Sequence, residues 1–347
     1  MNFIEEKLLG LFVKTNGVLS KPLLGGLGHI FMLHRVLPEE QRCQYTFNYD
    51  LAITPEYLEY CIKFFRERDY EFIDLDEMLL RLKGKGKSNK KFVVLTFDDG
   101  YRDNLTYGLP VLKKHNVPAV VYVTNCFPNS TAIFWWFLLE DLLRNKSEFT
   151  YRTQTIEKRF TWGAGDKGNK HLIELRTLIK NTPAAEFREM IKQSFGLTEE
   201  QLTDMCKALS LTWDEIKLLS NESLITIGAH TMSHLPLSKM NEEEALQEMV
   251  QSKTELELKL GKPVEHFAYP YGTFDEAFLP EYRLAEKAGF KSSVINRAAN
   301  VFAENAQFSQ SLPRFPLGNN VNEQKLNYII NGITHFSYNG FAKAIHY

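Results

Sequence analysis

Short runs of consecutive apolar residues alternate along this chain with segments whose apolar residues recur every three or four positions. The runs predict strands buried on both faces, as in parallel sheets, and the recurring pattern predicts amphipathic helices. The predicted strands cover residues 29–36, 72–73, 92–95, 119–124, 224–229, 263–269, 291–295 and 311–315. The predicted helices cover residues 55–68, 78–82, 108–115, 214–219, 241–259, 281–288 and 322–333. This alternation predicts an α/β fold with parallel strands and right-handed crossovers, either an open doubly wound sheet or a barrel.

One segment, from about residue 127 to 210, interrupts this order. It predicts a helix with a heavy apolar face over 132–143 and a hairpin over 149–162. Three further helices are predicted at 171–180, 184–193 and 199–209. The segment is too long for one crossover, so we predict an insertion that covers one end of the body. The predicted organisation is an N-terminal helical segment (1–28), a first barrel part (29–126), a mainly helical insertion (127–210), a second barrel part (211–320) and a C-terminal helix and tail (321–347).

Composition narrows the class of protein. The chain has 347 residues with 44% hydrophobic and 24% charged residues, which is ordinary for a globular protein. A formal net charge of -2 gives no electrostatic reason to expect nucleic acid as a partner. The four cysteines are scattered and form no CxxC pair, so neither a disulfide framework nor a thiolate zinc site is expected.

The first 26 residues contain Glu5 and Glu6 and no long apolar core, so they do not resemble a signal peptide. The longest apolar run elsewhere, 132–139, is too short to span a bilayer. We therefore expect a cytoplasmic protein. Residues 1–28 are interpreted as a helix packed on the body, with peripheral membrane contact as the alternative. The sequence carries no sign of an oligomeric state.

Residues 163–168 spell a literal GxGxxG. A dinucleotide site requires a buried strand before this motif and an acid at the end of the next strand. A polar hairpin precedes it here, so no nucleotide cofactor is predicted.

The predicted strand at 92–95 is followed by Thr96 and Phe97, and then by two adjacent carboxylates, Asp98 and Asp99. Paired carboxylates at the exit of a buried strand are costly unless a metal ion or a shared proton neutralises them. The alternative is a strand-to-loop turn, where Asp and Gly are common for local reasons.

His230 and His234 follow another predicted strand, 224–229. On a surface helix this spacing is often incidental, but the carboxyl ends of parallel strands meet on one face, where sites are built. Two imidazoles and one carboxylate leave open positions on Zn²⁺, Fe²⁺ or a similar ion. We predict Asp99, His230 and His234 as ligands of Zn²⁺ or another divalent transition metal, with Asp98 free to take a proton from water.

These motifs together resemble a known family. The chain contains TFDDG (96–100) followed by HTMSH (230–234), and also LTWDEI (211–216) and FAYPYG (267–272). With these motifs it is similar to the polysaccharide deacetylases, also called NodB-homology proteins or family 4 carbohydrate esterases. The resemblance runs from about residue 29 to 314, apart from the insertion. It implies an irregular (β/α) barrel with about seven strands, Asp98 as catalytic base and Asp99, His230 and His234 as metal ligands. It also implies that the backbone N–H of Tyr271 helps to hold an oxyanion.

Two features of the family pattern are missing. Ala268 stands where many members carry Arg, and no Leu-x-His follows residue 272. We predict that His34, after Leu33, supplies the general acid, as in a branch of the family that looks circularly permuted, and that Arg314 orients Asp98. The alternatives are a strand-end histidine bonded to backbone and a structural ion pair.

The predicted function is the metal-dependent removal of N-acetyl groups from sugars of a polysaccharide or other glycan. Three alternatives stay open: an O-deacetylase, a catalytically weak glycan-binding protein, and a metal-barrel hydrolase of a small amide. Acetate release separates catalysis from binding, and an open groove favours a glycan over a small molecule.

Overall fold

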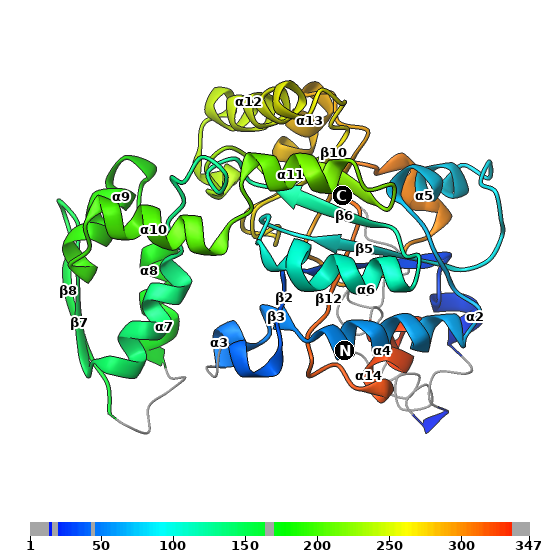
Figure 1. Ribbon diagram of the computed structural model, residues 1–347, viewed down its shortest axis with the longest axis horizontal. Coiled ribbons are helices and arrows are strands. Elements are labelled where there is room, and N and C mark those ends of the chain that lie inside the picture. The colour runs from blue at the N-terminus through cyan, green and yellow to red at the C-terminus, as the bar shows by residue number, and fades with distance from the viewer. Residues whose placement is uncertain (1–13, 16–19, 43–45, 164–169, 335–347) are drawn as a thin grey trace, which may run out of the picture.

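The computed structural model describes residues 14–15, 20–42, 46–163 and 170–334 (Figure 1). Its centre is a parallel sheet in the order β11-β10-β9-β6-β5-β1-β12, with the short strand β4 also paired to β5. The bounds are β1 Gly28–Leu33, β4 Glu71–Phe72, β5 Phe92–Phe97, β6 Ala119–Val123, β9 Ile225–Ala229, β10 His266–Ala268, β11 Ser292–Val294 and β12 Phe315–Pro316.

The two edges of this sheet approach each other. Val294 in β11 forms a parallel bridge to Leu312, three residues before β12, and the Leu312 N–H donates to the Ser293 carbonyl at 2.9 Å. The sheet therefore curls into an irregular barrel. The predicted (β/α) barrel is confirmed, with seven strands in succession and β4 beside them.

Helices cover the outside of the barrel (Figure 1). They are α4 Pro55–Arg66, α5 Leu75–Leu82, α6 Leu109–Lys114, α11 Trp213–Ser220, α12 Glu242–Leu260, α13 Leu279–Lys287 and α14 Glu323–Ile330. Strand β5 shows why its run has no polar alternation: Val93, Leu95 and Phe97 pack in the cluster that includes α4 and α12, whereas Phe92 and Val94 pack on the other face. Both faces are buried, as the continuous apolar run predicted.

The first predicted strand, 29–36, is wrong as a single element. Strand β1 ends at Leu33, and β2 (Arg35–Val36) pairs instead with β3 (Ala52–Ile53) in a separate two-stranded sheet. Asp103 causes the break, because it accepts hydrogen bonds from the Arg35 side chain and the Val36 N–H at 2.8 Å each. The chain therefore turns out of the barrel at His34.

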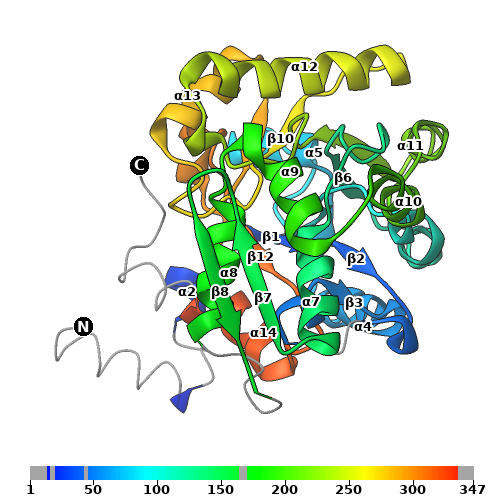
Figure 2. The same ribbon diagram turned by 90° about the vertical axis from the view of Figure 1, so that its left-hand side faces the viewer.

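Residues 127–210 contain elements with a hydrophobic cluster of their own. These elements are α7 Trp135–Asn145, β7 Glu148–Arg152, β8 Glu157–Thr161, α8 Lys170–Lys180, α9 Ala184–Phe195 and α10 Glu199–Leu209. They lie beside the barrel at the left of Figure 1, toward which the arrowheads of β5 and β6 point, and face the viewer in Figure 2. The insertion thus stands at the carboxyl ends of the strands, while the predicted segment boundaries stay a prediction.

Two short helices precede α4 in the chain: α2 (Lys21–Leu24) and α3 (Thr46–Tyr49). The predicted N-terminal helix lies mostly outside the described residues, as do Cys43 and most of the GxGxxG motif at 163–168. Cys61, Cys126 and Cys206 are buried free thiols. Among the described helices, none combines the length and the apolar character that crossing a bilayer requires.

Candidate active site

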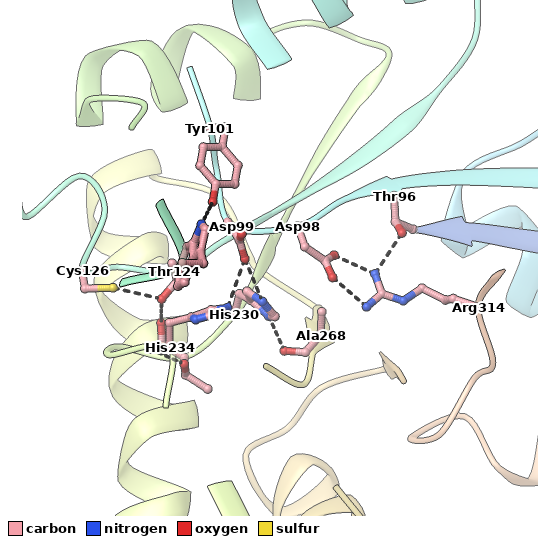
Figure 3. Close-up of polar contacts among 12 residues, drawn as sticks. Thr96, Asp98, Asp99, Tyr101, Thr124, Cys126, His230, His234, Ala268 and Arg314 are labelled. Atoms are coloured by element: carbon pink, nitrogen blue, oxygen red, sulfur yellow. Dashed lines mark hydrogen bonds and ion pairs between the residues drawn. The ribbon is translucent and has the colours of Figure 1, made fainter. Parts of the chain in front are cut away.

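The acid pair lies where the chain leaves β5. Asp98 and Asp99 are each only 3% exposed. Asp99 has φ 77° and Gly100 φ 91°, left-handed conformations that turn the chain sharply. The two carboxylates consequently point apart, Asp98 toward Arg314 and Asp99 toward the two histidines (Figure 3).

Asp99, His230 and His234 form one cluster. Asp99 Oδ1 lies 3.3 Å from His230 Nε2 and 3.1 Å from His234 Nε2. One ligand atom from each residue lies within 4.8 Å of the other two. His230 Nδ1 is 2.7 Å from the Ala268 carbonyl, which only accepts, so Nδ1 carries the proton and Nε2 presents a lone pair.

The chemistry of this donor set fits a divalent cation. Asp99 Oδ1 is buried and has no hydrogen-bond donor among the described residues. Burial raises the pKa of Asp99, but the charge of His234 and the hydrogen bonds from His230 and His234, when these rings are protonated, outweigh it and hold that pKa well below the ordinary value. An ionised oxygen facing two imidazole nitrogens is what zinc-type sites use. The structure therefore brings together the three residues that the sequence predicted as ligands.

The loop between the two histidines is held from outside the cluster. Thr231 (φ 66°) and His234 (φ 58°) both have left-handed backbones, which non-glycine residues adopt when their surroundings impose it. Glu248 on α12 accepts hydrogen bonds from the N–H groups of Met232 and Ser233 and from the Ser233 hydroxyl, each at 2.9 Å. Sequence reasoning missed Glu248, because nothing in the pattern of α12 separates it from the helix's other acids.

Asp98 is paired with Arg314, which is 1% exposed and precedes β12. Arg314 donates to both carboxylate oxygens, from Nη1 at 2.6 Å and Nη2 at 2.8 Å, and also to the Thr96 hydroxyl at 3.0 Å (Figure 3). Burial raises the pKa of Asp98, but the charge and hydrogen bonds of Arg314 outweigh it and lower that pKa. Asp98 is thus held ionised, with its orientation fixed.

His34 and Tyr271 line one pocket of about 320 Å³ together with Asp98, Asp99, His230 and His234. His34 is half-buried, and its carbonyl accepts from the Asn104 side chain at 2.8 Å. Its imidazole is close enough to Asp98 and Asp99 to contribute to the lowered pKa of both. Tyr271 (φ 62°) packs its ring 5.1 Å from that of His234, and its backbone N–H donates to no acceptor among the described residues.

The insertion completes this pocket with Trp135, Trp136, Arg176 and Lys180. Trp136 is fixed by its indole N–H, which donates to the Tyr101 hydroxyl at 3.2 Å, and its ring lies 5.8 Å from that of His234. Burial raises the pKa of Tyr101 well above its ordinary value, so the hydroxyl stays neutral. The apolar face of the predicted helix at 132–143 was visible in the sequence, but its place over the histidines was not.

Comparison with known proteins supplies independent evidence. A family model described as Polysaccharide deacetylase matches residues 85–292. YxkH of Bacillus subtilis (strain 168), which is named for polysaccharide deacetylation, is 23% identical over 244 residues, covering 70% of this chain and 58% of YxkH. The chain therefore spans less than two thirds of that relative.

Solved structures share the fold. The deacetylase PplD of Streptococcus pyogenes, in complex with acetate, has a TM-score of 0.57 at 18% identity, covering 87% of this chain and 97% of its own. A de-N-acetylase from Aggregatibacter actinomycetemcomitans has a TM-score of 0.56 at 16% identity, covering 87% and 99%. IcaB from Ammonifex degensii has a TM-score of 0.54 at 17% identity, covering 88% and 97%. At these identities the likeness concerns the fold alone.

Proposed function

The chain belongs to the polysaccharide deacetylase family, and from this premise we propose that it hydrolyses N-acetyl groups on sugars of a glycan. Water and the amide give acetate and a free amine. The observation that carries the proposal is one pocket lined by an ionised, oriented carboxylate and by a separate cluster suited to a metal ion.

Asp99, His230 and His234 would hold the metal, which we propose to be Zn²⁺ or another divalent transition metal. When bound, such an ion polarises a carbonyl and lowers the pKa of water. The Ala268 carbonyl keeps the Nδ1 proton of His230 in place, so that Nε2 stays available. The ring of His234 is supported by contacts at tilted angles with the rings of Trp136 and Tyr271.

Asp98 is the proposed general base. Its lowered pKa keeps it ionised at neutral pH, and the two hydrogen bonds from Arg314 fix its orientation. The carboxylate takes the proton of the attacking water. Arg314 is too deeply buried and too fully engaged to serve as a substrate contact, so we assign it as a positioning residue.

Tyr271 and His34 are proposed for the remaining two steps. The Tyr271 backbone N–H donates to the oxygen that gains negative charge as the carbonyl carbon becomes tetrahedral. His34 gives a proton to the departing nitrogen, because an imidazole can carry and release a proton and the residue lines the same pocket as Asp98 and Asp99.

Acetate release from an N-acetylglucosamine oligosaccharide by zinc-loaded protein tests this proposal. Wild type should release stoichiometric acetate and amine. Asp98→Asn preserves shape and removes the base, so turnover should fall by about 10²–10⁴-fold while bound zinc, measured by metal analysis, stays near one per chain. Zinc-loaded wild type that frees no acetate from acetylated saccharides would overturn the proposal in favour of glycan binding.

A further inference from the structure

A second cavity of about 200 Å³ adjoins the catalytic pocket. We call it the side chamber. It lies between the insertion and the barrel loops, and it shares five wall residues with the catalytic pocket: Trp135, Trp136, Lys180, His234 and Tyr271. The two cavities therefore meet at His234 and Tyr271, beside the proposed reacting carbonyl.

The rest of the chamber wall is mainly apolar. It consists of Cys126, Phe127, Ala132, Ile133, Phe187, Met232 and Leu235, with Thr131, Arg188 and Ser233. These last three side chains and Lys180 already have protein partners. Ser233 donates to Glu248 at 2.9 Å, Thr131 to the Cys126 carbonyl at 3.4 Å, Arg188 to Glu199 at 3.0 Å and Lys180 to Glu276.

These hydrogen bonds decide which kind of ligand the side chamber can bind. A sugar ring would bring several hydroxyl groups to a wall on which these four side chains are already bonded within the protein, and hydroxyls that lose water without gaining a partner are costly. A hydrocarbon group needs no hydrogen-bond partners, and its transfer from water into an apolar cavity is favourable. The wall favours an apolar guest over a second sugar residue.

Size and direction identify that guest further. An apolar cavity of roughly 150 Å³ holds a benzene molecule, so the methyl group of an acetyl would leave most of the chamber empty. The chamber borders His234 and Tyr271 but not His34 or Asp98. Because His34 marks the side of the departing amine, the chamber lies toward the acyl side of the scissile bond.

We propose that the side chamber is an acyl subsite, and that this protein removes N-acyl groups with chains of about three to six carbons as well as acetyl. The inference rests on the proposed function. The balanced step is the same hydrolysis: the C–N bond breaks, a C–O bond forms with oxygen from water, and the amine takes up the proton. The carboxylate product leaves with its hydrocarbon chain drawn from the chamber.

Rates on a series of acyl groups carried by one sugar test the proposal. The probes are glucosamine oligosaccharides bearing N-acetyl, N-propionyl, N-butyryl or N-hexanoyl groups, and the readout is kcat/KM for amine release. Burying one methylene is worth up to about fourfold in kcat/KM, so N-butyryl should be cleaved up to about 15-fold better than N-acetyl. A wild-type protein that cleaves N-butyryl more than tenfold worse than N-acetyl overturns the subsite.

Two substitutions probe the wall from opposite directions. Ala132→Leu fills the chamber and should lower the butyryl-to-acetyl ratio of kcat/KM at least tenfold. The matched control is Ala208→Leu, on the exposed side of α10, which should keep the wild-type ratio. Phe187→Ala enlarges the chamber and should shift the preference toward hexanoyl. An unchanged ratio in both chamber variants would overturn the proposal.

Binding of carboxylate products separates this inference from the proposed function. Acetate, propionate and butyrate are titrated calorimetrically into zinc-loaded protein, which requires no turnover. Affinity that rises with chain length and loses this rise in Ala132→Leu supports the chamber even if no amide is cleaved. Affinity that is flat or falling with chain length overturns the chamber even if N-acetyl is hydrolysed.

Discussion

The two ends of the barrel each bury a histidine, and they use it differently. At the amino end, His266 begins β10, and its Nδ1 is 2.8 Å from the hydroxyl of Ser292, while its Nε2 faces Asp76 of α5 at 3.8 Å. At the carboxyl end, the Nε2 atoms of His230 and His234 converge on a carboxylate oxygen that has no hydrogen-bond donor among the described residues.

The difference shows what separates a structural cluster from a reactive one. Both ends contain histidine beside an acid, and His266 and His230 are each 2% exposed or less. At the amino end, both ring nitrogens face partners across two strands and a helix, which ties these elements together. At the carboxyl end, one carboxylate oxygen and two imidazole nitrogens converge on one spot beside a cavity. The predictions below test this contrast.

The largest expected effect belongs to His34. His34→Ala removes the proposed proton donor to the leaving nitrogen, so kcat should fall by about 10²–10⁴-fold on the N-acetyl sugar. Zinc content should stay near one per chain, because His34 is not among the three proposed ligands. Added imidazole should restore part of the rate. Unchanged turnover in His34→Ala would remove this residue from the mechanism.

Arg314 should affect both rate and pH dependence. Its charge lowers the pKa of Asp98 against the opposing effect of burial, so Asp98 is ionised, and active as a base, above that lowered value. Arg314→Met removes the largest effect that opposes burial, so the acid limb of kcat/KM should move to higher pH. Breaking a buried pair also costs about 3–5 kcal/mol of stability. Urea unfolding measures this cost, and the double variant Arg314→Met/Asp98→Asn should recover part of it. An acid limb that stays in place would contradict the assigned pairing.

Much of this contrast was predictable from the sequence at the level of strands and their ends. The apolar run of β5 predicted a doubly buried strand, and strand polarity then predicted that Asp99, His230 and His234 would lie on one face. Arg314 was reached by asking what could replace the arginine missing at Ala268, and in the structure it pairs with Asp98. The positions of β5 and of the three clustered residues were predictable because they depend on the chain's local pattern and on the geometry of parallel sheets, whereas Arg314 was reached only through the family resemblance.

Features that depend on side-chain contacts between distant elements were not predictable. The strand expected over 29–36 breaks at His34 because the Arg35 side chain and the Val36 N–H donate hydrogen bonds to Asp103. Asp103 lies 67 residues from Val36 in the sequence. Trp136 covers His234 through a hydrogen bond to Tyr101 that no periodicity reveals. Glu248 is one of many acids in α12, and only its three contacts distinguish it.

Glu248 should affect metal affinity more than chemistry. Glu248→Ala frees the backbone of Met232 and Ser233, so the left-handed turn before His234 loses its support. Zinc affinity should fall by about 10–100-fold, as for other residues that orient ligands from outside the site. Competition with a chromophoric chelator measures it. Excess zinc should restore turnover, which a general loss of folding would not allow, and Glu243→Ala, exposed in the first turn of α12, should bind zinc as wild type does.

The smallest catalytic effect is expected at the amino end. His266→Phe keeps a ring in the core but leaves the fully buried Ser292 hydroxyl without that partner, which should cost about 1–3 kcal/mol of unfolding free energy.

His266 also lowers the pKa of Asp76 to about 2. A carboxyl with a lowered folded-state pKa contributes stability above its unfolded value, near 4, and loses it as pH falls toward 2. The stability difference between variant and wild type should therefore narrow on acidification from pH 5 to pH 3. Zinc affinity and kcat per folded molecule should stay at wild-type values, because the ring of His266 faces Ser292 of β11 and Asp76 of α5 at the amino end of the barrel. A tenfold loss of zinc affinity in His266→Phe would break the division between the two ends.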